Sequence, residues 1–111
     1  MIGLILMALA APSMAPEVAA TVRYDSIACR MVKNGPAGRC QLALVPRGDG
    51  KISAYATAAD GHQRIIYFQK GEAKFSNAGG RIEVDRNGDT MIIRVGAAEV
   101  YEVPDRLVAG D

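Results

Sequence analysis

The chain has 111 residues, half of them hydrophobic and 23% charged, which is a globular composition and excludes an intrinsically disordered chain. The 13 Lys and Arg against 12 Asp and Glu leave a net charge of +1, which argues against nucleic-acid binding through a general basic surface. The length suits one domain, and the composition as a whole singles out neither a membrane surface nor an acidic substrate.

Residues 1–20 have the layout of a secretory signal peptide. An apolar block over 2–9 is followed by small residues, the first charge is Glu17, and no Lys or Arg precedes the block. The block is shorter than the roughly 20 apolar residues that cross a membrane, and two prolines after it argue against a continuous buried helix. We therefore predict cleavage near residue 15 or 20, a mature domain over 21–111 without a membrane span, and a periplasmic or secreted location.

Two cysteines, Cys29 and Cys40, follow this leader. An even count in a small exported domain predicts one disulfide, with two unpaired buried thiols as the alternative. The segment between them, RMVKNGPAGR, contains two Gly and a Pro that let the chain turn back. The spacing excludes a CxxC redox or zinc pair, and closing this loop should contribute about 3 kcal/mol.

The rest of the chain is a series of short runs of β-branched and aromatic residues, each ended by a turn signal. No long stretch has apolar residues three and four apart, and the tail PDRLVAGD is expected to form a last half-strand or a turn of helix. In chain order the predicted strands are 21–32, 40–45, 51–58, 62–70, 72–78, 81–85, 90–95 and 98–103.

Runs of this length and spacing predict an all-β fold, a small antiparallel meander that forms a sandwich or barrel of about 7–8 short strands. The run RIIYF (64–68) is apolar on both faces, as strands buried on both sides are, so we expect it near the centre of the structure. The run AEVYEV (98–103) is our candidate for an exposed edge that extends a partner's sheet.

Asp85, Asn87 and Asp89 have the alternate spacing of the oxygen ligands in a calcium loop. Such a loop also needs Gly at its sixth position and an acid at its twelfth, where this chain has Thr90 and Gly96. Asn-Gly between alternating strands instead predicts a type I′ hairpin turn, in which both residues have positive φ. We therefore predict a turn and no metal site.

No catalytic constellation is predicted. The only histidine, His62, follows an Asp-Gly turn and is expected to be exposed, without the orienting partners a general base needs. The RGD sequence over 47–49 is interpreted as an exposed hairpin loop. Glu99, Glu102 and Asp105 lie near one another in sequence and leave a carboxylate-pair hydrolase open as an alternative.

Aromatic residues carry the candidate binding site. In a chain without Trp they are expected mainly to fill the core. Tyr67 and Tyr101, near Arg64 or Arg94, are the alternative, a face that binds sugar or peptide.

The run DGHQRIIYFQKGEAKFSNA, followed by MIIRVGAAEVYEVPDRL, resembles a group of uncharacterised small exported proteins of Gram-negative bacteria. The shared features are an Asp-Gly turn, a strand ending in aromatics, a Lys-Gly turn and a closing YEVPD. The resemblance covers roughly the last half of the chain. It implies a bacterial periplasm, and no activity or site residue.

The function expected from the sequence is a periplasmic binding or accessory protein, not an enzyme, that presents hairpin loops or a sheet edge to a protein or envelope partner. No cofactor is predicted. The alternatives are an inhibitor of a hydrolase such as lysozyme, which would use the loop between Cys29 and Cys40, and the carboxylate-dependent hydrolase named above.

Overall fold

The computed structural model describes residues 21–32 and 35–109, and the chain there forms eight antiparallel strands and one short helix. The predicted signal peptide and its cleavage site lie outside the described residues. No helix among those described has the length and apolar character to cross a membrane. The elements are β1 (Arg23–Arg30), β2 (Gly38–Gly48), β3 (Lys51–Thr57), β4 (Gln63–Gln69), β5 (Glu72–Ser76), β6 (Ile82–Asn87), β7 (Thr90–Val95), β8 (Glu99–Pro104) and α1 (Asp105–Val108).

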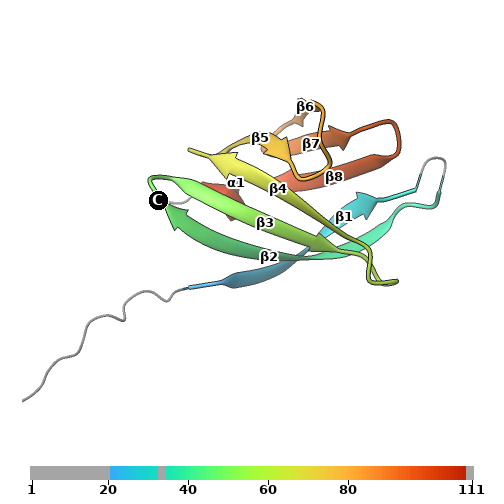
Figure 1. Cartoon of the computed structure of the whole chain (residues 1–111), viewed down its shortest axis with the longest axis horizontal. Helices are drawn as coiled ribbons and strands as arrows, with labels where there is room; N and C mark the ends of the chain where they lie inside the picture. The colour runs from blue at the N-terminus through green and yellow to red at the C-terminus, as the bar shows by residue number, and fades with distance from the viewer. Residues whose placement is uncertain (1–20, 33–34, 110–111) are drawn as a thin grey trace, which may run out of the picture.

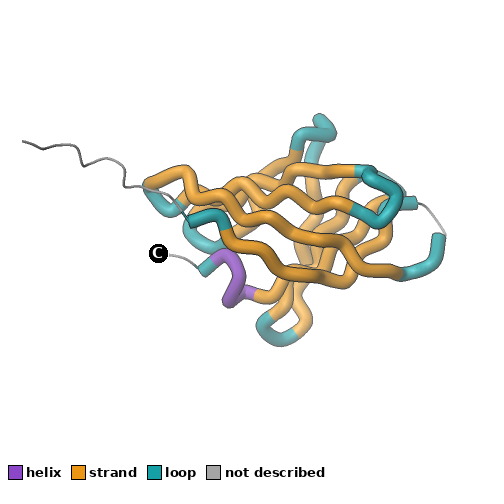
Figure 2. The backbone as a smooth tube through the Cα atoms, turned by 90° about the horizontal axis from the view of Figure 1, so that it is seen from below, coloured by secondary structure: helices purple, strands orange, loops and turns teal. Residues whose placement is uncertain are grey.

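All eight strands belong to one sheet in the order β5-β4-β3-β2-β1-β8-β7-β6. Every pairing joins strands that are neighbours in sequence, except that of β1 with β8. The sheet curls until its two ends, β5 and β6, approach each other, which makes a nearly closed barrel (Figures 1 and 2). The predicted all-β antiparallel fold is confirmed, and the barrel is the form it takes.

Side chains that alternate along each strand fill the interior. Along β2, for example, Cys40, Leu42 and Leu44 are buried between more exposed neighbours, as the two-residue period of a strand requires. Each fully buried aliphatic side chain contributes about 1.5–3 kcal/mol. The largest fully buried side chains are Tyr101, Phe68, Ile27, Leu42, Leu44, Ile66, Met91, Ile93, Val103 and Val108.

The helix α1 closes one end of the barrel. Its Leu107 and Val108 are buried in the core. Arg23 Nη2 at the start of β1 donates to the Leu107 carbonyl at 2.9 Å, and the Asp105 N–H donates to the Asp89 carbonyl at 2.7 Å. These bonds hold the helix across the barrel end.

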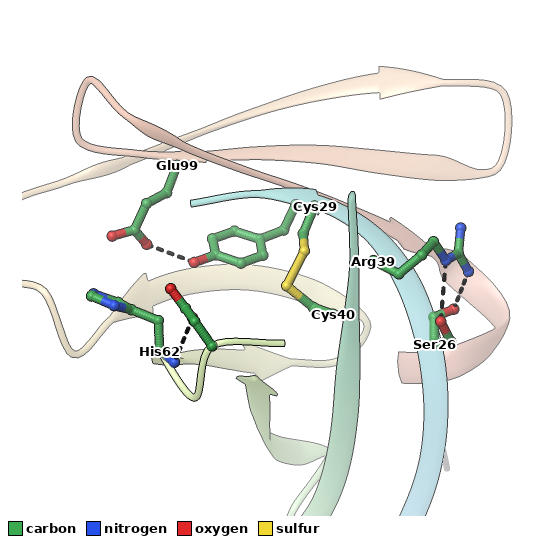
Figure 3. Close-up of a disulfide and its surroundings, with 8 residues drawn as sticks. Ser26, Cys29, Arg39, Cys40, His62 and Glu99 are labelled. Atoms are coloured by element: carbon green, nitrogen blue, oxygen red, sulfur yellow. Dashed lines mark hydrogen bonds between the residues drawn. A yellow bond between two sulfur atoms is a disulfide. The ribbon is translucent and has the colours of Figure 1, made fainter. Parts of the chain in front are cut away.

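The predicted disulfide between Cys29 and Cys40 is confirmed. The two cysteines lie on the paired strands β1 and β2, where Cys40 faces Ile27 across the ladder and Cys29 faces Gly38. Both side chains are buried in the core (Figure 3). The bond therefore links two central strands of the sheet from inside.

The hairpin at Asn87-Gly88 is confirmed, but its predicted turn type is wrong. Asn87 pairs with Thr90 in the ladder, so the two loop residues are Gly88 and Asp89. Of these only Gly88 has positive φ, at 64°, which fits a type II′ turn and not type I′. The Asp85 carboxylate accepts a hydrogen bond from Arg94 Nη1 at 2.9 Å.

Two expectations about these runs are wrong. The run AEVYEV forms β8, which pairs with β1 on one side and β7 on the other, so it is not an edge. The run RIIYF lies in β4 and supplies Ile66 and Phe68 to the core, but Ile65 and Tyr67 on its other face are only partly buried, so it is not buried on both sides. The first error arises because the place of a strand in the sheet depends on the long-range β1–β8 pairing, which no local pattern specifies.

Candidate functional site

Arg64 and Tyr101 lie inside the barrel, where both bind the carboxylate of Glu99. Arg64 Nε donates to Glu99 Oε1 at 2.8 Å and Arg64 Nη2 donates to Oε2 at 2.6 Å. The Tyr101 hydroxyl donates to Oε1 at 2.6 Å (Figure 3). This two-pronged geometry is the strong form of an Arg–carboxylate pair. We name these three residues the interior bridge, because they connect β4 with β8, strands that are not paired in the sheet.

The interior bridge is largely withdrawn from water, with 19% of the Arg64 side chain and 12% of the Glu99 side chain exposed. Hydrogen bonds from Arg64 hold the pKa of the Glu99 carboxyl below its ordinary value, and the Tyr101 hydroxyl acts in the same direction. Burial, together with the bond to Glu99, raises the pKa of the Tyr101 hydroxyl. The bridge therefore stays as a charged pair with a neutral phenol.

A second group of bonds ties this bridge to the turn after β5. Arg64 Nη1 donates to Asn77 Oδ1 at 3.1 Å, and the Ile65 N–H donates to the same oxygen at 3.1 Å. With these bonds each nitrogen of the Arg64 guanidinium has a protein acceptor, and both oxygens of Glu99 have a protein donor. Because Glu99 begins β8 and α1 follows the end of that strand, the bridge lies toward the end of the barrel opposite α1.

Tyr67 lies on the other face of the sheet. In β4 the side chains of Arg64, Ile66 and Phe68 point to the interior side, and Tyr67 alternates with them on the exterior. The three residues predicted to share one binding face are therefore divided, with Arg64 and Tyr101 inside and Tyr67 outside. Arg94, the other predicted neighbour, is exposed and paired with Asp85.

Tyr67 instead belongs to a row of exterior side chains that crosses four strands. The strand register places Val45, Ser53, Tyr67 and Phe75 side by side on β2, β3, β4 and β5. The Tyr67 and Phe75 rings are stacked with centroids 4.7 Å apart and planes at 29°, and 54% of Phe75 is exposed. The small Ser53 beside two large rings leaves a depression in the surface.

This depression, which we name the exterior hollow, has a volume of about 270 Å³. Besides Ser53, Tyr67 and Phe75, the side chains of Arg47, Lys51 and Lys74 line it. Lys74 reaches it because the β4–β5 ladder shifts register between Phe68 and Tyr67, which makes Lys74 the extra residue of a β-bulge. Bulges of this kind re-aim side chains at sheet edges.

The Arg47 side chain is held flat against the sheet. Its Nε donates to Ser53 Oγ at 3.1 Å and its Nη2 donates to the Tyr55 hydroxyl at 2.8 Å. Neither Arg47 nor Lys51 makes an ion pair with any residue that the structure describes. Lys74 makes only an exposed pair with Glu72 at 3.4 Å. The hollow therefore combines an exposed aromatic ring with cations that lack strong carboxylate partners.

The carboxylates considered for hydrolysis do not converge. Glu99 points inward to the interior bridge, Glu102 is exposed on the exterior side of β8, and Asp105 accepts two hydrogen bonds from Arg86 Nη1 at 3.0 and 2.8 Å. Within 21–32 and 35–109, no group of three His, Cys, Asp or Glu side chains could hold a metal ion.

The other sequence features fall on turns. His62 is exposed as expected, and its N–H donates to Asp60 Oδ1 at 3.0 Å. The RGD sequence forms the end of β2 and its turn, with Asp49 at φ 57°. The loop between the cysteines, proposed for an inhibitor, includes residues 33–34, which lie outside the described part of the chain.

Sequence reasoning missed most of the hollow: Arg47, Lys51, Ser53, Lys74 and Phe75. None of these residues indicates a site by itself, since a cation or a serine in a strand commonly lies on the protein surface. Their grouping depends on the register of four strands, and the only local signal is the clustering of Lys74 and Phe75 in a short edge strand. Comparisons of the chain with protein-family models, curated proteins and solved structures gave no match.

Proposed function

We propose that this chain is an exported, non-catalytic binding protein of the periplasm, and that its exterior hollow takes an acidic sugar of the cell envelope. The observation that carries the proposal is the combination in one depression of the exposed Phe75 ring, stacked on Tyr67, with the cations Arg47, Lys51 and Lys74.

The chemistry of the hollow matches an acidic sugar in two respects. The C–H face of a pyranose ring packs on a flat aromatic ring, and the Tyr67–Phe75 pair supplies such a platform at low cost in side-chain entropy. A sugar carboxylate is planar, and the Arg47 guanidinium has donors left beyond those bound to Ser53 and Tyr55. Arginine recognises planar carboxylates through paired hydrogen bonds, so the hollow favours a uronic acid over a neutral sugar.

Binding is favoured over catalysis by the composition of the hollow. Its lining residues include no His, Asp or Glu, the side chains that most often transfer protons in enzymes. The residue Ser53 is buried, with 4% of its surface exposed, and its hydroxyl accepts a hydrogen bond from Arg47 Nε.

Export is supported by the disulfide and by the leader-like sequence over 1–20. Disulfides persist in oxidising compartments and are rare in the cytosol. In a Gram-negative bacterium, the source that the sequence resemblance implies, that compartment is the periplasm, where acidic envelope glycans are within reach.

The test is a titration of the mature protein with digalacturonate, followed by calorimetry and by amide chemical shifts. We expect binding that shifts amides of β3, β4 and β5, and that weakens with added salt because exposed charges are screened. The methyl ester of digalacturonate, which lacks the charges, should bind at least about fivefold more weakly, the loss of roughly 1 kcal/mol for one charge contact. Absence of binding, or equal binding of the ester, would refute the proposal.

Two variants and their matched controls localise the site. Phe75→Ala should weaken binding about fivefold through loss of the aromatic platform, whereas Tyr24→Ala, at an exposed aromatic outside the hollow, should not. Arg47→Glu should abolish measurable binding. Its control is Arg39→Glu, which lies on the same strand roughly 26 Å away at about 3.3 Å per residue and likewise bonds a serine, Ser26.

A further inference from the structure

A second exterior depression lies over β1, β8 and β7, on strands that take no part in the exterior hollow, and the two share no lining residue. It has a volume of about 300 Å³. Its lining side chains alternate with buried ones along each strand, so they point to the exterior. We name it the β8 depression, and the strand side chains that line it are Ala28, Arg30, Ile92, Arg94, Val100 and Glu102.

The strand register surrounds an aliphatic floor with charges of both signs. Val100 lies opposite Arg30 on one side and opposite Arg94 on the other. The two arginine Cα atoms are therefore roughly 10 Å apart, at two strand spacings of about 4.8 Å. Glu102, the next exterior residue along β8, is opposite Ile92 and diagonal to both arginines. Diagonal neighbours lie about 7–8 Å apart, within reach of long side chains.

These charged groups do not satisfy one another. Among the described residues, neither Arg30 nor Glu102 makes an ion pair, and Arg94 makes only an exposed pair, through Nη1, with Asp85. In the same part of the chain the Arg30 Nε atom is buried and has no hydrogen-bond partner. Buried polar atoms without a partner are uncommon in folded proteins, so this nitrogen indicates a missing acceptor.

From this arrangement we propose that the β8 depression binds a free aliphatic α-amino acid. The ligand carboxylate would lie between Arg30 and Arg94, and its ammonium group would bind Glu102. The aliphatic side chain would pack on Val100 and Ile92. The inference goes beyond the proposed function and does not depend on it, because the exterior hollow is a separate site.

The chemistry of a zwitterion fits both signs of charge at once. Arginine binds a planar carboxylate through paired N–H groups, of which Nε–H is one. Binding requires the Arg30 side chain to turn its Nε–H toward the depression, and this movement breaks no hydrogen bond at that nitrogen. An α-amino acid carries its ammonium and carboxylate groups on adjacent carbon and nitrogen positions, so it can bridge Glu102 and an arginine that do not touch each other.

The test titrates the mature protein with L-leucine and two analogues, followed by amide chemical shifts. One analogue, 4-methylpentanoate, lacks the ammonium group, and the other, L-leucinamide, lacks the carboxylate. We expect leucine to shift amides of β1, β7 and β8 in a saturable manner. Each analogue should bind about fivefold more weakly, the effect of one exposed charge contact. Glycine, which has no side chain to pack on the floor, should also bind more weakly than leucine.

Two variants should give opposite patterns with the two analogues. Glu102→Gln should weaken leucine binding about fivefold and leave 4-methylpentanoate within about twofold. Arg30→Gln should weaken both leucine and 4-methylpentanoate about fivefold and leave leucinamide within about twofold. The matched controls outside the depression are Asp49→Asn and Arg81→Gln, since both residues are exposed and make no ion pair in the described part of the chain.

This crossed pattern separates recognition of the ligand from damage to the fold, because a destabilised variant would lose all three ligands alike. Saturable binding with the crossed pattern would support the inference. It is overturned if leucine gives no saturable shift, if leucine and both analogues bind equally, or if the shifted amides lie in β3, β4 and β5. None of these results bears on digalacturonate, so the two sites are tested separately.

Discussion

The interior bridge and the exterior hollow are built from the same kinds of side chain, arginine beside an aromatic ring, and they differ in whether those groups are already satisfied. Inside, Arg64 donates hydrogen bonds to Glu99 and Asn77, and the Tyr101 hydroxyl donates to the Glu99 carboxylate. Outside, Arg47 and Lys51 have no described carboxylate partner, and Phe75 is half exposed.

The difference indicates which group serves stability and which is free for a ligand. A saturated, buried polar group holds the fold, because removing one member leaves the others unpaired away from water. An unsaturated, exposed group contributes little to the fold and retains its binding capacity. Changes in the interior should therefore reduce stability, and changes in the hollow should reduce binding alone.

Among the cross-link and polar contacts, the largest effect on stability is expected from the disulfide, which is also an interior feature. The double variant Cys29→Ala, Cys40→Ala should lose about 3 kcal/mol of unfolding free energy, because the unfolded chain regains the entropy of the open loop. Urea unfolding measures this. A loss below about 1 kcal/mol would mean that the core, and not the bond, holds β1 to β2.

Glu99→Gln should lower the unfolding free energy by about 2 kcal/mol, because it leaves the mostly buried Arg64 without a counter-charge. The matched control is Asp85→Asn, which breaks the pair with Arg94 at 2.9 Å on the exposed surface and should cost about 0.5 kcal/mol or less. Equal losses in the two variants would remove the distinction between a saturated interior and a free surface.

The stabilisation by the interior bridge should be lost at low pH. The pKa of Glu99 is lowered from 4.5 in the folded state by Arg64, so its contribution is complete above about pH 4.5 and is lost as pH falls through the lower folded pKa. The stability difference between the native protein and Glu99→Gln should therefore shrink as pH is lowered below about 4.5. A difference that stays constant from neutral pH to about pH 3 would contradict the bridge.

The smallest effect on stability is expected in the hollow. Phe75→Ala should cost under about 1 kcal/mol, since the ring is already half exposed. Ile66→Ala, on the adjacent strand with no exposed surface, should cost about 2–5 kcal/mol through the cavity it leaves. Comparable losses for the two would show that Phe75 is part of the core and not a surface platform.

The strands themselves could be predicted from sequence, because turn residues and two-residue alternation are local. The run TMIIRV corresponds to β7 at both ends, and the Asn-Gly corner joins β6 to β7 as expected. Cys29 and Cys40 also pair as their number and spacing indicated.

The interior bridge and the exterior hollow could not be predicted from the sequence, because both depend on contacts between residues that are distant along the chain. Arg64 and Glu99 are 35 residues apart, and nothing near either one specifies the other. Tyr67 was singled out for its aromatic ring, but its neighbours in space, Ser53 and Phe75, follow only from strand register and from the bulge at Lys74. Short sequence patterns therefore identify the strands, whereas the residues that share a surface are determined by how the strands pair.

The pairing of β1 with β8 has a consequence for how the molecule forms. Strands β1–β5 and β6–β8 are each a local meander, and within the sheet only this pairing joins them. Its register places Ala28 opposite Glu102. These residues are far apart in sequence, so forming the pair carries the entropic cost of closing a loop that contains most of the chain. We therefore expect the joining of the two meanders to limit the rate of folding, and a circular permutant opened between β5 and β6, in which this pairing becomes local, should fold faster.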